Sequence, residues 1–466
     1  MKTAMILCAI TASTAAAERP NIVLMLADDQ SWSGTSVAMH PDVAASKSDI
    51  YRTPNLERLA AQGMRFSAAY APAPVCSPTR ISIQTGKSPA RLHWTKAAPP
   101  EDGRKLTEPR LVKSIASDEI TIGERLRDAG YATAHYGKWH LAGGGHESHC
   151  YDESDVDTGN EQAFKFTDPN PVDLFGMAER AEKFMAKNQR AGKPFYIQLS
   201  WNALHAHGNA LKATKAKYEH LQGGDGKQYE TAPITEDLDT AVGRVMNAVD
   251  RLGLAGTTFV LYTSDNGSGG GKRNGGLNGG KGGVWEGGIR VPFIVRGPGV
   301  KPNAWCHAPI VGYDFLPTFC EWAGAASKSL PPGVDGGSFA RLIADGGIGA
   351  VVRPRAELVF HFPHYQSEDG PQSAILVGDL KLMHFYEDDC DALFDLAADV
   401  SERRDLANAR PTETAALRKR LNAHLAAVGA QFPTPNPNYD PSKPPPPVKK
   451  GGGQKKGDAK PKKGKS

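Results

Sequence analysis

Unbroken apolar runs alternate with amphipathic segments over the first 350 residues of the chain. Four runs are almost entirely apolar, at positions 21–27, 195–200, 258–263 and 293–295. Such runs are typical of strands that are buried on both faces of a parallel sheet. Before the third run, apolar residues recur every three or four positions, at Leu238, Val242, Val245, Val249 and Leu252. This spacing places them on one buried face of a long helix.

Shorter patterns complete this part of the chain. A helix is predicted over 54–62, because Thr53 and Pro54 are suited to its first turn and Gly63 to its end. A further helix is predicted over 120–128 and a short strand over 132–136. Strands that alternate with helices predict a doubly wound, mostly parallel α/β sheet flanked by helices.

The pattern changes after residue 350. Strands are predicted close together over 357–362, 374–377 and 381–386, followed by a helix over 412–428. These elements indicate a smaller C-terminal α+β domain. We therefore expect a large domain over 18–350, the smaller one over 351–432 and a tail over 433–466.

The tail is rich in proline, glycine and lysine. Nine lysines and one aspartate lie between Lys443 and Ser466, and they account for the formal net charge of +4. Because almost no apolar residues are present to bury, we expect the tail to be disordered. Its charge leaves two interpretations open, a solubilising tail or a tether to an anionic glycan or cell surface. No nucleic-acid partner is expected.

The N-terminus predicts export. Lys2 precedes an apolar run over 4–10, and small residues end at Ala17, as in a cleavable secretory signal over 1–17. The mature protein is thus expected to be periplasmic or secreted. No later run approaches the roughly 20 apolar residues of a transmembrane helix, so no transmembrane segment is predicted.

An oxidising compartment would permit disulfides. Four cysteines are available for them, at Cys150, Cys306, Cys320 and Cys390. The sequence leaves open whether they form two bridges, one bridge or none.

Carboxylates follow two of the predicted strands. Asp28 and Asp29 come directly after the first run, and Asp265 and Asn266 come after the third. In open α/β sheets, the carboxyl ends of the strands are where ligands bind. Clustered carboxylates repel one another unless a cation lies among them, and an all-oxygen set favours Ca²⁺, with Mg²⁺ less favoured. The alternative is an aspartate pair that caps a loop.

A cysteine motif connects this edge to a known family. Cys76-Ser77-Pro78-Thr79-Arg80, with Gln84-Thr85-Gly86 behind it, resembles the first signature of the sulfatase family. The resemblance extends over about residues 19–425 and implies an alkaline phosphatase-like fold. It also implies that Cys76 is oxidised by a formylglycine-generating maturation enzyme to formylglycine, which acts as nucleophile and as a ligand of the calcium ion.

The chemistry of an aldehyde agrees with that expectation. Its hydrate carries two hydroxyls, so one can attack sulfur and the other can later expel sulfate, which a thiol cannot do. A cation beside the attacking hydroxyl would lower its pKa. Arg80, one helical turn after Cys76, would point to the same side and hold the hydrate.

Three more motifs resemble those of the family in the same order, although the one around His205 lacks both prolines that the family usually has there. The resemblance implies that Lys138 binds sulfate oxygens and that His140 removes the proton that releases sulfate. His205 is implied as the acid for the leaving alcohol and as a sulfate ligand, although His207 lies close enough to exchange places with it. Lys281, within the glycine-rich segment 277–292, would bind the bridging oxygen.

The substrate is expected to be a sulfated carbohydrate or an aryl sulfate. His361 and His364 end a strand of the smaller domain, where they could contact the substrate or serve only the fold. Two other functions are open. One is a phosphate or phosphonate monoesterase on the same fold, and the other is an inactive protein that binds sulfated glycans.

Overall fold

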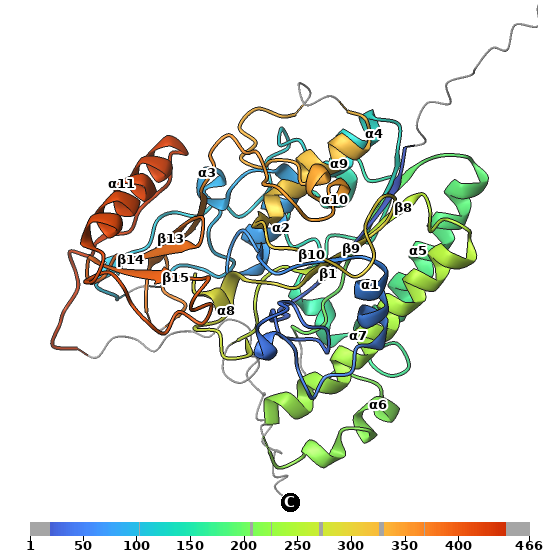
Figure 1. The fold of residues 1–466 in the computed structure, drawn as a ribbon, viewed down its shortest axis with the longest axis horizontal. Helices are drawn as coiled ribbons and strands as arrows, with labels where there is room; N and C mark the ends of the chain where they lie inside the picture. Colours follow the sequence, from blue (N-terminus) through green and yellow to red (C-terminus); the bar gives the residue numbers. More distant parts are fainter. Residues whose placement is uncertain are drawn as a thin grey trace, which may run out of the picture.

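An eight-stranded sheet forms the centre of the larger part of the molecule (Figure 1). In this computed structural model, residues 19–443 are described except 102, 206–207, 225, 270–273, 326–329 and 368. The predicted signal over 1–17, His207 and the tail beyond residue 443 lie outside the described residues. In spatial order the strands are β10 (Ala304–Cys306), β2 (Met64–Phe66), β9 (Phe293–Arg296), β8 (Thr258–Ser264), β1 (Asn21–Ala27), β7 (Phe195–Ser200), β5 (Ala132–Gly137) and β6 (Glu153–Ser154).

The sheet is mostly parallel. Only β9 runs antiparallel to its neighbours, β2 and β8. β1 lies between β7 and β8, pairs in parallel with both, and is buried along its whole length. Its side chains alternate between the two faces, so that Val23 and Met25 enter one core while Ile22 and Leu24 enter the other. The predicted doubly wound α/β fold is confirmed.

Helices cover both faces of the sheet. One core contains residues of α1 (Pro54–Gln62), α5 (Leu174–Arg190) and α7 (Gly226–Arg251). The opposite core contains residues of α2 (Cys76–Thr85), α4 (Ile122–Asp128), α9 (Phe315–Trp322) and α10 (Ala340–Ala344). Within the described residues, none of the helices combines the length and the apolar character that crossing a bilayer requires.

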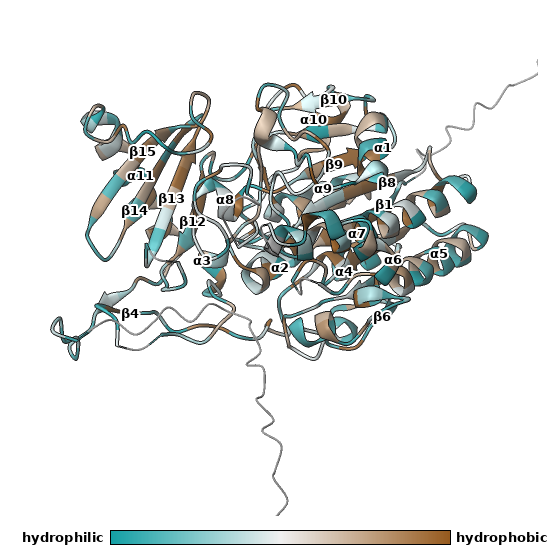
Figure 2. Cartoon of the chain, turned by 90° about the horizontal axis from the view of Figure 1, so that it is seen from below, coloured by the Kyte–Doolittle hydropathy of each residue, from teal (hydrophilic) through white to brown (hydrophobic). Residues whose placement is uncertain are grey.

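A four-stranded antiparallel sheet lies beside the main one (Figure 2). It consists of β12 (Leu358–Phe362), β13 (Gln372–Val377), β14 (Leu380–Phe385) and β15 (Cys390–Asp395). One face is covered by α11 (Pro411–Ala427), through Leu417, Leu421 and Leu425. The other face packs against Val75 and Val284, which precede α2 and α8 (Glu286–Ile289). The smaller sheet therefore supports the segments around the cysteine motif and the glycine-rich motif.

A buried ionic cluster lies where the smaller sheet packs against α8. Lys381 of β14 places its Nζ 2.8 Å from Glu286 Oε1 and 2.7 Å from Glu402 Oε1, and all three side chains are fully buried. Glu286 also accepts a hydrogen bond from Arg290, and Glu402 accepts one from the backbone nitrogen of Glu286. A buried cation thus links the smaller sheet to α8 through a pair of carboxylates.

Some elements depart from the sequence predictions. Helix α4 begins at Ile122 because Thr121 caps it, with its side chain accepting from the Glu124 nitrogen. Helix α5 is not among the predicted elements, although Leu174, Met177 and Ala181 give it an apolar face. The short strands β2, β6 and β10 also went unpredicted, because two or three residues carry no periodic signal.

The remaining elements are short. They are β3 (Ala69–Tyr70), β4 (Leu106–Thr107), β11 (Ile310–Val311), β16 (Thr434–Pro435), α3 (Pro89–Leu92), α6 (Lys212–Ala216), and 3-10 turns at Ala44–Ser46, His146–His149, Asn160–Phe164, Pro171–Asp173, Glu219–Leu221 and Gly312–Asp314. All five described cysteines carry free thiols, so the structure contains none of the disulfides that the sequence left open.

Candidate functional site

Polar side chains from distant parts of the chain meet beyond the carboxyl ends of β1, β5, β7 and β8. Each of these strands is buried and parallel to its neighbour, so the residues that follow them emerge at one edge. The predicted site residues gathered there are Asp28, Asp29, Cys76, Arg80, Lys138, His140, His205, Asp265, Asn266 and Lys281.

Two aspartates at the end of β1 are each paired with a lysine. Lys138 Nζ donates to Asp28 Oδ2 at 2.6 Å, and both side chains are fully buried. Lys281 Nζ lies 2.6 and 2.7 Å from the two carboxylate oxygens of Asp29. Burial raises the pKa of Asp28, but the charges of Lys138, His205 and Arg80 outweigh it and hold the pKa well below its ordinary value.

The third carboxylate is paired with an arginine. Arg80 donates to Asp265 Oδ2 from Nη2 at 2.7 Å and from Nε at 3.0 Å, and its Nη1 donates to the carbonyl oxygen of Lys138 at 2.8 Å. Burial and the neighbouring charge of Asp28 raise the pKa of Asp265 to about 7, despite the opposing effects of Arg80 and Lys138. A bound cation would act in the opposite direction and favour the ionised carboxylate.

Oxygen atoms without partners point to a cation in this cluster. Asp28 Oδ1 and Asn266 Oδ1 are buried and make no hydrogen bond to any described residue. Asn266 directs its Nδ2 to Asp29 Oδ1 at 2.7 Å, so its own oxygen is left for another ligand. Buried oxygens without hydrogen bonds are costly unless something binds them. Together with the oxygens of Asp29 and Asp265 they form the hard, all-oxygen set that suits calcium.

Cys76 is the first residue of α2. Its side chain is buried and lies close enough to Arg80, Asp265 and Lys281 to influence the charge of each. Arg80 stands one turn later in the same helix, which brings both side chains to the edge of the sheet. Cys76 is thus placed between the carboxylates and the cationic side chains.

Lys138 and His140 follow β5 and are fixed by the segment 155–159. Thr158 accepts a hydrogen bond from the His140 nitrogen at 2.8 Å, and its hydroxyl donates to the Gly137 carbonyl oxygen at 2.6 Å. Asp155 Oδ2 accepts from the Gly137 nitrogen at 2.7 Å. The sequence did not indicate this segment, because neither residue belongs to a recognisable motif. The hydrogen bonds of the segment 155–159 therefore hold the backbone of Gly137 and His140 in place at the end of β5.

His140 borders an open cavity of about 320 Å³ together with Ser77, Trp94, Lys113 and Glu161. Its backbone is left-handed, with φ of 60°, which is uncommon for a residue other than glycine. Burial and the charges of Lys138 and Arg80 lower the pKa of His140 to about 3. The imidazole is therefore neutral near pH 7.

His205 lies over the first pair of aspartates. Its Nδ1 is 3.3 Å from Asp29 Oδ2 and 3.7 Å from Asp28 Oδ1. Burial lowers the pKa of His205, but the negative charge of these nearby aspartates raises it to about 9. The alternative residue His207 lies outside the described residues.

The glycine-rich segment wraps closely around itself to present Lys281. The Lys281 nitrogen donates to the Ser268 carbonyl oxygen at 2.8 Å, and the Gly282 nitrogen donates to that of Pro74 at 2.9 Å. A Cβ on Gly288 would lie 2.0 Å from the Gly283 carbonyl oxygen, so only glycine fits there. The bond to Pro74 connects this segment directly to the residues before Cys76.

His361 and His364 are engaged elsewhere. His361 lies 2.6 Å from Ser373 Oγ through Nδ1 and 2.8 Å from the Gln431 carbonyl oxygen through Nε2. His364 lies 2.8 Å from Glu108 Oε2 and 2.7 Å from Thr95 Oγ1. Both rings are buried and both nitrogens of each have protein partners, so the structure gives them contacts within the fold and none with the carboxylate cluster.

Comparison with known proteins agrees with this arrangement. The family model for sulfatases matches residues 20–325. Arylsulfatase A of Homo sapiens is 30% identical over 426 residues, which cover 82% of this chain and 78% of the relative. A sulfatase of Formosa agariphila is 28% identical over 495 residues, which cover 88% of each chain.

Solved structures show the same fold. The crystal structure of Ps i-CgsB has a TM-score of 0.70 at 22% identity and covers 87% of this chain and 93% of its own. BT4656, solved in complex with its substrate D-glucosamine-2-N,6-O-disulfate, has a TM-score of 0.68 at 20% identity, with coverage of 88% and 98%. The extent of the family match and the identity to arylsulfatase A show that the chain belongs to the sulfatase family and is a sulfuric ester hydrolase.

Proposed function

We propose that this enzyme hydrolyses sulfate esters of carbohydrates, with formylglycine made from Cys76 as nucleophile and calcium as its metal. The observation that carries the proposal is that three ion pairs and two buried oxygens without hydrogen bonds lie together near Cys76. When bound, calcium would polarise the nucleophile and balance negative charge. Asp28, Asp29, Asp265 and Asn266 would hold it, together with the oxidised side chain of Cys76.

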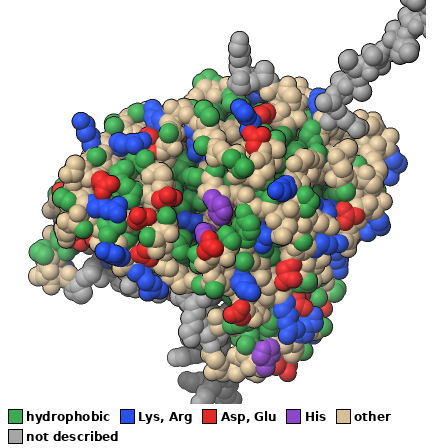
Figure 3. All heavy atoms as spheres, viewed as in Figure 1, with side chains coloured by type: hydrophobic (Ala, Val, Ile, Leu, Met, Phe, Trp, Pro, Cys, Tyr) green, Lys and Arg blue, Asp and Glu red, His purple; other side chains and the backbone are tan. Residues whose placement is uncertain are grey.

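The charge balance of the site supports an anionic substrate. Three carboxylates face three cationic side chains, so these six groups sum to a formal charge of zero, and a protonated His205 adds one positive charge. A divalent ion makes the site positive, which favours a sulfate ester. On the face seen in Figure 3, basic and acidic side chains are interspersed.

The cationic side chains have separate tasks in this proposal. Lys138 and Lys281 bind sulfate oxygens, and Lys281 offsets the charge that grows on the bridging oxygen as the ester bond breaks. Arg80 holds the nucleophile against Asp265, which fixes its orientation. Each of these side chains is held by a short charged hydrogen bond, so little reorganisation is needed when substrate enters.

The two histidines divide the proton transfers. His140 is neutral near pH 7 and accepts the proton whose removal releases sulfate. His205 donates a proton to the departing alcohol. That assignment depends on the place of His205 beside Asp29, since a cation on the aspartates would itself change the pKa of His205.

The carbohydrate substrate is supported by the named relatives. They include the N-acetylgalactosamine-6-sulfatase of Sus scrofa, 30% identical over 335 residues that cover 62% of this chain and 59% of the relative. Aryl sulfates are the second substrate class. We also propose export after removal of residues 1–17, action of a maturation enzyme on Cys76, and the domain limits 18–350, 351–432 and 433–466.

Mass spectrometry of the purified active enzyme tests the proposal. The peptide that contains Cys76 should be about 18 Da lighter than encoded, which is the difference between a thiol and an aldehyde side chain. Cys76→Ala should lose hydrolysis of nitrophenyl sulfate while its thermal midpoint stays near that of the parent. An unmodified thiol in fully active protein, or equal turnover of nitrophenyl phosphate, would contradict the proposed function.

A further inference from the structure

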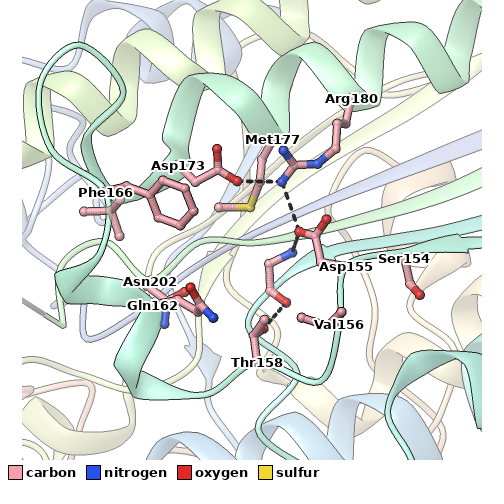
Figure 4. A pocket seen from close by; sticks show the side chains of 12 residues that line it. Ser154, Asp155, Val156, Thr158, Gln162, Phe166, Asp173, Met177, Arg180 and Asn202 are labelled. Carbon is pink, nitrogen blue, oxygen red and sulfur yellow. Dashed lines mark hydrogen bonds and ion pairs between the residues drawn. The ribbon is translucent and has the colours of Figure 1, made fainter.

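A second cavity lies on the other side of the segment that fixes Lys138 and His140. It has a volume of about 470 Å³, within the range of small-molecule sites (Figure 4). Its lining comes from the end of β5, the segment 154–166 and the start of α5. The side chains proposed for sulfate and cation binding take no part in this lining, so the cavity has no role in the mechanism described above.

One stretch of chain separates this cavity from the one beside His140. Asp157 and Gly159 face the cavity beside His140, whereas Val156 and Gln162 face the second one. Thr158 lines both. The width of a single extended chain is about 5 Å, so a ligand that crosses this stretch would reach from one cavity into the other.

Apolar side chains gather at this second cavity. Phe166 and Val156 line it and are 37% and 76% exposed. Phe164, 47% exposed, belongs to the same stretch but does not line the cavity. Val156 and Phe166 therefore offer exposed apolar surface at the cavity, of the kind that marks a binding surface.

Polar groups without partners accompany these apolar residues. Gln162 makes no side-chain hydrogen bond to any described residue. Asn202 donates from Nδ2 to the Gly159 carbonyl oxygen at 2.9 Å, and its own amide oxygen accepts from none of the described residues. Amide groups beside an apolar surface suit a ligand that has an apolar face and hydroxyls around its edge.

The charge of the cavity disfavours a second anion. Arg180 donates to Asp155 Oδ2 at 3.0 Å and to Asp173 Oδ2 at 2.6 Å, as the dashed lines in Figure 4 mark. One guanidinium therefore serves two carboxylates, which leaves a formal charge of −1. An uncharged ligand fits this balance better than a uronate or a further sulfate.

We propose that this cavity is a subsite for an uncharged sugar ring that adjoins the sulfated ring of the substrate. The proposal rests on the sulfatase function proposed above and specifies its substrate class. The apolar face of the ring lies against Phe166, and its hydroxyls bond to the amides of Gln162 and Asn202. The sulfated ring then occupies the cavity beside His140.

The test compares four substrates with the formylglycine-bearing enzyme. These are nitrophenyl sulfate, a sulfated monosaccharide, and two disaccharides in which the same sulfated ring is joined to galactose or to glucuronate. We expect the highest kcat/KM for the galactose disaccharide. Phe166→Ala should lower that value about tenfold and leave kcat/KM for the first two substrates within about twofold of the parent.

Phe164→Ala is the matched control. It removes an exposed phenyl group from the same stretch but not from the cavity, so it should change none of the four values. Equal kcat/KM for the monosaccharide and the galactose disaccharide, preference for glucuronate, or an equal loss on all substrates in Phe166→Ala would each overturn the subsite. The subsite would also be overturned if the enzyme hydrolysed nitrophenyl sulfate but cleaved none of the sugar sulfates. Absence of nitrophenyl sulfate hydrolysis would instead refute the proposed function.

Discussion

Replacing Lys381 with methionine tests the buried ionic cluster that joins the smaller sheet to α8. Lys381 Nζ lies within 2.8 Å of both Glu286 and Glu402, and water reaches none of the three side chains. Methionine keeps the length of the side chain and removes its charge. Breaking a buried ion pair in this way costs about 3–5 kcal/mol of stability, because the remaining carboxylates are left without compensation.

The pH dependence of that loss identifies its cause. Burial and the charge of Glu286 raise the pKa of Glu402 to about 7, above its ordinary value near 4.5. A carboxyl group whose pKa is raised by folding stabilises the protein relatively at low pH, and this contribution is lost as pH rises from about 4.5 to about 7. Without Lys381 the pKa of Glu402 rises further, so the protein continues to lose stability as pH rises above about 7.

Urea denaturation at about pH 6 and about pH 8 measures the effect. The difference in unfolding free energy between the parent and Lys381→Met should grow with pH, by up to about 1.4 kcal/mol per unit for each extra proton bound. Adding Glu402→Gln should recover most of the stability. Lys183→Met, at an exposed pair with Glu179, is the control and should have little effect. A loss that is the same at both pH values would refute the reasoning.

Three further predictions concern the site. Exhaustive chelation should abolish hydrolysis of nitrophenyl sulfate, Ca²⁺ should restore it better than Mg²⁺, and the thermal midpoint should rise with Ca²⁺ concentration; full activity after chelation would exclude the metal. His205→Ala should slow alkyl sulfates far more than nitrophenyl sulfate, since a poor leaving group needs the acid more, whereas equal slowing would assign that role elsewhere, for example to His207. Asp155→Asn should lower kcat for nitrophenyl sulfate about tenfold, with KM nearly constant, because it weakens the acceptor for the Gly137 nitrogen; an unchanged kcat would argue against this positioning role.

The sequence predicted the fold where the pattern is long and uninterrupted. The predicted limits of β1 and β7 match the structure, and those of β8 differ by one residue. The rule that ligands gather at the carboxyl ends of parallel strands was enough to bring Asp28 and Asp265 together. Strand β10 pairs with β2, more than 200 residues earlier, and no local pattern can indicate such a partner.

The ion pairs within the site could not be predicted from the sequence either, because their members lie far apart along the chain. Motifs predict functional roles for Lys138 and Lys281, yet nothing in their spacing shows that one pairs with Asp28 and the other with Asp29. The contacts of His361 and His364 also could not be predicted from the sequence. Their position at the end of a strand suggested a place at the pocket, and the sequence could not show that their ring nitrogens contact Ser373 and Glu108 within the fold.

The smaller sheet has a role in the geometry of the site, which follows from what its inner face contacts. Val75 and Val284 belong to that shared core, and each lies within three residues of a proposed catalytic side chain, Cys76 or Lys281. A shift of the sheet would therefore move the nucleophile and the lysine that is proposed to stabilise the leaving oxygen. Errors of about 1 Å in such positions are enough to reduce a rate a hundredfold. The buried charges of Lys381, Glu286 and Glu402 hold the sheet against α8, so they also maintain the distance on which the proposed catalysis depends.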